Sequence, residues 1–236
     1  MKLAIIGAMD LEVDALRAAL TDEKVTTAAG MKFSEGKLDG ADVVVVRCGI
    51  GKVNAGMCVQ ILADRFGVTH VVNTGIAGSL KAELDIGDLV ISEDAIYHDM
   101  DVQIFGYAPG QVPGTEQPAF VAEKNMAKIA LALCKEVNPD INALPGRIVS
   151  GDHFISSSEV KDRIISTFGG SCCEMEGAAV AHAATLNGLP FLIVRAISDK
   201  ADGSAEMDYP AFERAAAQHS ARLGRAMAAV MQEVYK

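Results

Sequence analysis

The chain has 236 residues, of which 50% are hydrophobic and 22% are charged, and its formal net charge is −10. This hydrophobic content is enough for one thick core and excludes a disordered chain. The acidic balance and the lack of any basic run longer than two residues exclude a nucleic-acid partner. No stretch approaches the roughly 18 uninterrupted apolar residues of a membrane span. We therefore expect a soluble protein that binds neither nucleic acid nor membrane.

The N-terminal segment and the cysteines predict a cytoplasmic protein. The apolar segment 3–9 is too short for a secretory signal, since acidic residues follow it at once. The five cysteines are odd in number and lack the CxxC spacing of a redox or zinc site. The five histidines are dispersed, without HxH or HExxH spacing. We expect reduced thiols, no metal and no cofactor.

Strand and helix patterns alternate along the first half of the chain. Continuous apolar runs predict buried strands, and apolar residues at helical spacing predict helices. Short alternating segments broken by glycines occupy residues 25–38. Strands are expected at 2–7, 42–47 and 70–74, helices at 10–20 and 53–66, and a glycine-rich turn at 75–78.

The second half continues the alternation after a long loop. A strand at 88–98 is followed by a segment up to residue 118 that is rich in glycine and proline, and loops of this length are usually functional. Beyond it we expect helices at 120–137, 159–167, 176–186 and 209–235, and strands at 146–150 and 191–197. No repeat or linker divides the chain. We therefore predict one α/β domain over residues 1–236, with three αβα layers around a mixed central sheet.

Three carboxylates occupy positions where such folds bind ligands. In open α/β sheets the ligand lies beyond the carboxyl ends of the strands, so polar residues directly after apolar runs are candidates. Glu12 follows the first strand, Glu176 lies in a Glu-Met-Glu segment, and Asp199 follows the apolar run of the last expected strand. Each could instead serve a helix terminus, where carboxylates cap and offset the helix dipole.

Eight segments in order along nearly the whole chain together carry a family resemblance. They are residues 4–9, 48–55, 73–78, 97–102, 105–107, 150–155, 174–176 and 195–199. The chain resembles the 5'-methylthioadenosine/S-adenosylhomocysteine nucleosidases of the purine nucleoside phosphorylase superfamily, and eight ordered segments are far more specific than any one motif. The resemblance implies a nucleoside phosphorylase-like fold. It also implies hydrolysis of the bond between adenine and ribose, in methionine salvage and methyl-cycle recycling.

The resemblance implies that Asp199 is the catalytic acid. Cleavage of the bond from C1' to N9 produces a poor anionic leaving group, so the base must be protonated. Asp199 would give its proton to adenine N7, which requires a pKa raised by burial. Ser198 and Arg195 would lie beside it, with Arg195 near the attacking water. For Arg195, a structural ion pair is the alternative interpretation.

On the same resemblance, Glu12 and Glu176 act at the sugar. Glu12 would orient and deprotonate the water that attacks C1', as a general base. Glu176 would accept hydrogen bonds from the ribose hydroxyls, interactions that can strengthen as positive charge develops on the sugar. Met175 would pack on the ribose, although a methionine at this position could simply fill a gap in the core.

The remaining implied contacts are with the base and the 5' substituent. Phe154 would stack on the purine and the backbone of Ile155 would read its edge, unless Phe154 belongs to the core. A neighbouring subunit of a homodimer would complete the apolar 5'-alkylthio pocket with Val102, Phe105 and Pro113 from its loop 101–114. The other residues implied to bind substrate are Met9, Ile50, Ile76, Ala77 and Gly78.

One position departs from the family pattern. Ile76 stands where many members have a serine that contacts the water or the ribose, so one hydrogen bond is expected to be missing. The ranking among methylthioadenosine, adenosylhomocysteine, 5'-deoxyadenosine and aminofutalosine depends on packing that the sequence does not reveal.

Two other functions fit parts of the pattern. A phosphate-dependent nucleoside phosphorylase would need arginines and glycine-rich backbone to hold phosphate, whereas Glu12 on the nucleophile side would repel it. A nucleoside-binding protein without activity is also compatible with the fold, because a fold does not determine function. Such a protein would have no reason to keep Glu12 together with Asp199.

Overall fold

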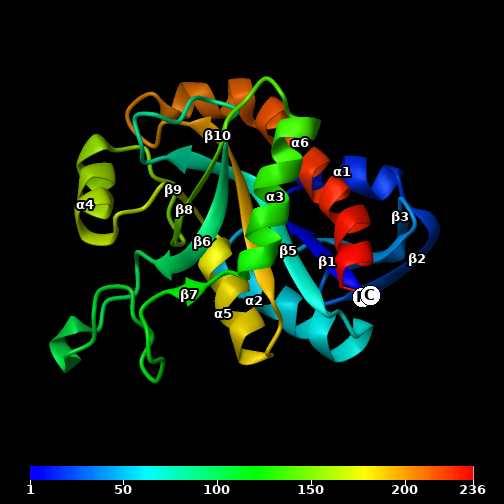
Figure 1. Cartoon of the computed structure of the whole chain (residues 1–236). Coiled ribbons are helices and arrows are strands. Elements are labelled where there is room, and N and C mark those ends of the chain that lie inside the picture. The colour runs from blue at the N-terminus through cyan, green and yellow to red at the C-terminus, as the bar shows by residue number, and fades with distance from the viewer. Residues whose placement is uncertain (236) are drawn as a thin grey trace.

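A computed structural model describes residues 1–235, with the exception of the side chains of Glu206 and Met207. Within these residues, ten strands form one mixed sheet with helices on both faces (Figure 1). The predicted α/β class with αβα layers around a mixed sheet is therefore confirmed. The strands are β1 Leu3–Gly7, β2 Thr21–Ala28, β3 Met31–Leu38, β4 Ala41–Arg47, β5 His70–Ser79, β6 Leu89–Tyr97, β7 Phe120–Val121, β8 Ala143–Ser150, β9 Cys172–Glu174 and β10 Phe191–Asp199.

The middle of the sheet is parallel and fully buried. β1 lies between β4 and β5, and β5 also pairs with β10, all in parallel register. Every residue of β1, β5 and β10 is buried, which explains why these strands are almost continuously apolar. Because the three strands are parallel, their carboxyl ends meet at one edge of the sheet, where α/β folds place their ligands.

The sheet also closes on itself at one side. Its strand order is β10-β6-β8-β9-β5-β1-β4-β3-β2, with β7 beside β6. The additional pairing of β10 with β5 turns the strands β5, β10, β6, β8 and β9 into a ring. This ring brings β9 next to the carboxyl ends of β5 and β10, where the sequence predicted the site.

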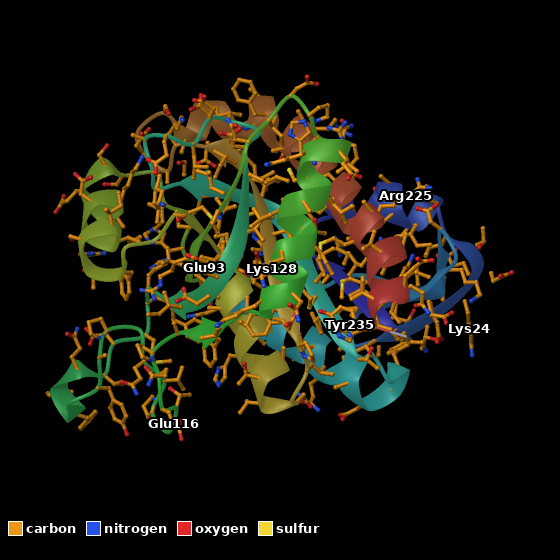
Figure 2. All side chains as sticks on the ribbon, viewed as in Figure 1. Lys24, Glu93, Glu116, Lys128, Arg225 and Tyr235 are labelled. Carbon is orange, nitrogen blue, oxygen red and sulfur yellow. The ribbon has the colours of Figure 1, made fainter. Side chains whose placement is uncertain are left out.

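The helices divide between the two faces of the sheet. On one face α6 contacts α1, α3 and the strands β5 and β10, and on the other face α2 packs against α5 (Figure 1). The loop of residues 98–119 projects from the body, and Figure 2 shows Glu116 on this projection. The helices are α1 Asp10–Ala18, α2 Lys52–Ile61, α3 Lys124–Val137, α4 Ser158–Phe168, α5 Gly177–Leu186 and α6 Ala205–Val234, with a π turn at Leu62–Phe66 and a 3-10 turn at Gln103–Phe105.

Several predicted boundaries were wrong. The expected glycine-rich turn at 75–78 is part of β5, where the glycines allow close approach of other side chains. The helix expected from Phe120 is preceded by the short strand β7. It begins only at Lys124, because the side chain of Glu123 accepts hydrogen bonds from two amides of its first turn. The three-residue strand β9 was missed, and α6 begins at Ala205 rather than near residue 209.

Two further observations concern the expected location. All five cysteines are free and buried. Among the described residues, no helix combines the length and the apolar character needed to cross a lipid bilayer.

Candidate active site

A cavity of about 510 Å³ lies beyond the carboxyl ends of β1, β5 and β10. The structure brings most of the predicted site residues to its wall. They are Met9, Glu12, Ile50, Ile76, Ala77, Gly78, Phe154, Met175, Glu176, Ser198 and Asp199. Ile155 lines a small adjoining cavity, which Asp199 and Phe154 share. The wall also contains residues that the sequence analysis did not identify, namely Ala8, Cys173, Glu174, Tyr209 and Pro210.

Glu12 lies in the first turn of α1 and is buried. One carboxylate oxygen accepts hydrogen bonds from the amides of Ala8 (2.6 Å) and Met9 (2.9 Å), and the other accepts one from the amide of Ile76 (3.1 Å). Burial raises the pKa of Glu12, against the opposing effects of Arg195 and the three amides. The helix-terminus role and a position on the cavity wall are therefore compatible, and a raised pKa suits a general base.

Two glycines of β5 make room for the carboxylates. A Cβ atom on Gly75 would lie 2.7 Å from Oε1 of Glu12, and one on Gly78 would lie 2.8 Å from Oδ1 of Asp199. Both distances are shorter than real Cβ contacts, so any side chain here would displace an acid. Residues 75–78, which were expected to form a turn, instead belong to a strand that the carboxylates of Glu12 and Asp199 contact closely.

Asp199 ends β10 and is buried on the opposite side of β5 from Glu12. Its Oδ2 accepts a hydrogen bond from the hydroxyl of Ser198 (2.8 Å), and its Oδ1 accepts one from the amide of Ala201 (2.8 Å). Burial raises the pKa of Asp199, and these two hydrogen bonds oppose the increase. A carboxyl group that is harder to ionise can hold a proton for transfer.

Arg195 is buried behind the cavity and does not line it. Its guanidinium forms an ion pair with Glu174, and it donates a hydrogen bond of 2.6 Å to Oδ1 of Asn73. The structural ion pair, left open as an alternative by the sequence, is thus present. Arg195 is also close to the first acid, because its Nη1 lies 3.3 Å from the position of a Cβ on Gly75, beside Oε1 of Glu12.

Glu174 links Arg195 to the start of α5. It accepts hydrogen bonds from the amides of Glu176 (3.2 Å) and Gly177 (2.8 Å) and from the hydroxyl of Ser150. Glu174 is the first acid of the Glu-Met-Glu segment that the sequence analysis singled out. No local signal distinguished Glu174, which forms the ion pair with Arg195, from Glu176, which accepts from the loop at Gly51. The distinction depends on contacts with β8 and β10, which are distant in sequence.

Glu176 faces the cavity beside a glycine-rich loop. Its Oε1 accepts a hydrogen bond of 2.8 Å from the amide of Gly51, and its Oε2 lies 4.0 Å from Nη2 of Arg195. Burial raises the pKa of Glu176, and the neighbouring charge of Glu174 raises it further. The buried side chains of Glu174 and Glu176 thus face the one guanidinium of Arg195. Glu176, which is the farther of the two from Arg195, is therefore difficult to ionise.

An aromatic pair forms the outer wall. Phe154 is 42% exposed, so it is not a core residue, and its ring meets that of Tyr209 edge-on with 5.6 Å between centroids. The hydroxyl of Tyr209 is 3.3 Å from the sulfur of Met9. No local sequence signal indicated Tyr209, because its position depends on how α6 crosses the end of the sheet.

The predicted residues of the long loop lie elsewhere. Val102, Phe105 and Pro113 do not line the cavity of their own chain, and Phe105 is 76% exposed. No cluster of three or more His, Cys, Asp or Glu side chains among the described residues could hold a metal ion. The polar groups on the cavity wall are carboxyl groups, the hydroxyls of Ser198 and Tyr209, the thiol of Cys173 and backbone amides.

Comparisons with known proteins show the family of the chain. Residues 2–229 match the family model described as the phosphorylase superfamily. The chain is 42% identical over 235 residues to the 5'-methylthioadenosine/S-adenosylhomocysteine nucleosidase of Geobacillus sp. (strain WCH70), with 99% of this chain and 100% of that protein covered. The chain belongs to the 5'-methylthioadenosine/S-adenosylhomocysteine nucleosidase family. The resemblance seen in the sequence is thereby confirmed.

Solved structures of related proteins contain the same fold. One is the nucleosidase of Colwellia psychrerythraea 34H in complex with adenine, with a TM-score of 0.94, 40% identity, and coverage of 97% of this chain and 95% of that one. Another is the futalosine hydrolase of Helicobacter pylori, with a TM-score of 0.90, 32% identity, and coverage of 96% and 97%. Proteins with this fold and at least 32% identity to the chain thus include both a nucleosidase and a futalosine hydrolase.

Proposed function

We propose that the protein hydrolyses the N-glycosidic bond of 5'-methylthioadenosine and S-adenosylhomocysteine, and also that of 5'-deoxyadenosine. The products are adenine and the 5-substituted ribose. The observation that carries this proposal is the placement of Glu12 and Asp199 on either side of β5 in one cavity, both with raised pKa values. The names of the relatives support the choice of substrate. We treat residues 1–236 as one catalytic domain.

Asp199 is proposed to be the general acid. The raised pKa keeps its carboxyl group protonated more readily when the nucleoside binds. It gives the proton to N7 of adenine, so the base leaves as a neutral molecule when the bond from C1' to N9 breaks. The hydroxyl of Ser198 then stabilises the resulting carboxylate through its hydrogen bond of 2.8 Å.

Glu12 is proposed to be the general base. Its carboxylate accepts the proton of a water molecule that attacks C1' on the face opposite to adenine, a contribution on the order of a hundredfold or more. The three backbone amides hold its orientation, and Arg195 adds the nearest positive charge. At position 76 the isoleucine contributes a backbone amide to Glu12 rather than a side-chain hydroxyl to the ligand.

Glu176 and the apolar wall are proposed to hold the nucleoside. Glu176 accepts hydrogen bonds from the ribose hydroxyls and offsets positive charge on the sugar in the transition state. Met175 packs on the ribose. Phe154 stacks on adenine, which contributes roughly 1 to 3 kcal/mol, and the backbone of Ile155 reads the edge of the base. Ala77 and Gly78 of β5 form the wall opposite Phe154.

A homodimer is proposed to complete the site. Several large apolar side chains are exposed on α2, just before its first turn and on the projecting loop, an arrangement typical of an interaction surface. They are Ile50, Val53, Met57, Ile104 and Phe105. A second copy that covers this surface would bring Val102, Phe105 and Pro113 of its loop to the 5'-alkylthio group, as the resemblance implies. The burial of a thioether there would favour 5'-thio substrates over adenosine.

The cellular setting follows from the same proposal. Five free, buried thiols are consistent with a reducing cytoplasm. Removal of methylthioadenosine and adenosylhomocysteine places the enzyme in methionine salvage and methyl-cycle recycling. Water is preferred to phosphate as nucleophile because Glu12 would repel an anion, and the buried guanidinium of Arg195 is already paired with Glu174.

Adenine release in phosphate-free buffer tests the proposal. The wild-type protein is expected to release adenine from 5'-methylthioadenosine, whereas Asp199→Asn and Glu12→Gln lose on the order of a hundredfold or more in kcat. Glu159→Gln, which changes an exposed carboxylate in the first turn of α4, is the matched control and should match the wild type. Release only after phosphate is added would favour a phosphorylase. Saturable binding of the nucleoside without any release would identify a binding protein.

A further inference from the structure

A second cavity, of about 590 Å³, adjoins the first. The two share the lining residues Ala8, Met9 and Ile50. The first cavity has an apolar wall with buried carboxyl groups, whereas the second is lined by charges of both signs on the surface. The charged residues are Asp10, Asp14, Arg47 and Arg214.

The second cavity opens at the sugar end of the first. The amide of Met9 donates to Glu12, the group proposed to activate water at C1'. Ile50 precedes Gly51, whose amide donates to Glu176, the group proposed to hold the ribose. Asp199, at the base end, does not line the second cavity. A substituent on the 5' carbon that is too long for the first cavity would therefore extend into the second.

The charges of this cavity are accessible to a ligand. Arg47 and Asp10 pair at 3.1 Å, with about half of each side chain exposed. Arg214, on α6, is exposed and forms no ion pair with any side chain that the structure describes. An exposed guanidinium with free donors binds a carboxylate in a bidentate manner. Asp10 and Asp14, whose carboxylates lie 3.5 Å and 3.8 Å from Nη1 of Arg17, line the same cavity and offer acceptors to an ammonium group.

We propose that this second cavity binds the amino-acid end of S-adenosylhomocysteine. Arg214, with Arg47, binds its α-carboxylate, and Asp10, with Asp14, binds its α-ammonium. This inference rests on the proposed function and adds a subsite that distinguishes the two substrates. The methyl group of methylthioadenosine is uncharged and too short to reach these residues, so the subsite contributes only to adenosylhomocysteine.

The test is the ratio of kcat/KM for S-adenosylhomocysteine to kcat/KM for 5'-methylthioadenosine. Arg214→Gln is expected to lower this ratio about threefold to fivefold, the most that one exposed ion pair contributes. The double variant Arg47→Gln/Arg214→Gln should lower it on the order of tenfold, mainly through KM. Arg222→Gln, which removes an exposed arginine elsewhere on α6, is the control and should leave the ratio unchanged.

Ionic strength gives an independent measurement on the wild-type enzyme. The ratio should fall as salt rises from about 0.05 to 0.5 M, because salt screens exposed charges and methylthioadenosine has none to screen. A ratio that stays constant in the double variant would overturn the inference and leave the proposed function intact. If the wild type hydrolyses neither nucleoside, the proposed function is wrong and the inference with it. Both substrates are compared on one preparation, so partial misfolding of a variant does not alter the ratio.

Discussion

Replacement of Gly75 by alanine would insert a methyl group between β5 and the carboxylate of Glu12. The new Cβ would lie 2.7 Å from Oε1 of Glu12, whereas ordinary contacts begin at 3.4 Å, so the carboxylate must move by about 0.7 Å. Such a shift breaks the geometry of the 3.1 Å hydrogen bond from the amide of Ile76. A displacement of about 1 Å at a reacting group costs up to a hundredfold in rate. We expect kcat to fall about thirtyfold to a hundredfold.

Adenine release under saturating 5'-methylthioadenosine measures this effect. Overpacking should also lower the free energy of unfolding by about 1 to 3 kcal/mol, measurable by urea denaturation. Gly224→Ala is the matched control, since a Cβ at this position of α6 meets only Cγ2 of Ile5, at an ordinary contact distance of 3.9 Å, and alanine favours a helix. In a Glu12→Gln background, Gly75→Ala should have a much smaller further effect on kcat. A Gly75→Ala enzyme with a kcat within about twofold of the wild type would refute the reasoning.

Three further predictions concern the buried charges. Ser198→Ala removes a hydrogen bond that favours the ionised form of Asp199, so the pKa of this acid rises and the alkaline limb of the pH profile of kcat moves to higher pH. Glu176→Gln should gain stability relative to the wild type as the pH rises. The pKa of Glu176 is higher in the folded than in the unfolded protein, so the protonated group stabilises the wild-type fold fully at low pH. This contribution to the free energy of unfolding is lost as the pH rises through the folded pKa. Thermal denaturation of both proteins at several pH values would show the difference. Arg195→Gln leaves Glu174 buried without its partner and should cost about 3 to 5 kcal/mol in urea denaturation.

The central strands could be predicted because their sequences record burial directly. β1 and β10 are buried on both faces, so both appear as apolar runs, and the carboxylates that follow them were identifiable from position. The glycines of β5 were misread for a physical reason. A glycine that permits a turn and a glycine that permits a close contact have the same local sequence signal. Only the approach of Glu12 and Asp199, distant in the chain, distinguishes the two.

The part of the site that depends on long-range contacts could not be predicted. The partners of Arg195 and Glu174 come from β5, β8 and α5, and no periodicity encodes which acid faces the guanidinium. Tyr209 reaches Phe154 only because α6 crosses the carboxyl end of the sheet. Pairing of β10 with β5, which closes the ring of strands, is likewise invisible in the apolar pattern.

The buried charges at the cavity are unequal, and this imbalance bears on the proposed catalysis. Three buried carboxyl groups, those of Glu12, Glu174 and Glu176, lie around the single guanidinium of Arg195. Burial therefore raises the pKa values of Glu12 and Glu176, and for Glu176 the charges of Glu174 and Glu12 raise the pKa further. Under the roles proposed for Glu12 and Glu176, positive charge that develops on the ribose would lie between these two groups and favour their ionised forms. The electrostatic cost of ionising them would then be relieved in the transition state more than in the bound substrate, which is the condition for a faster reaction.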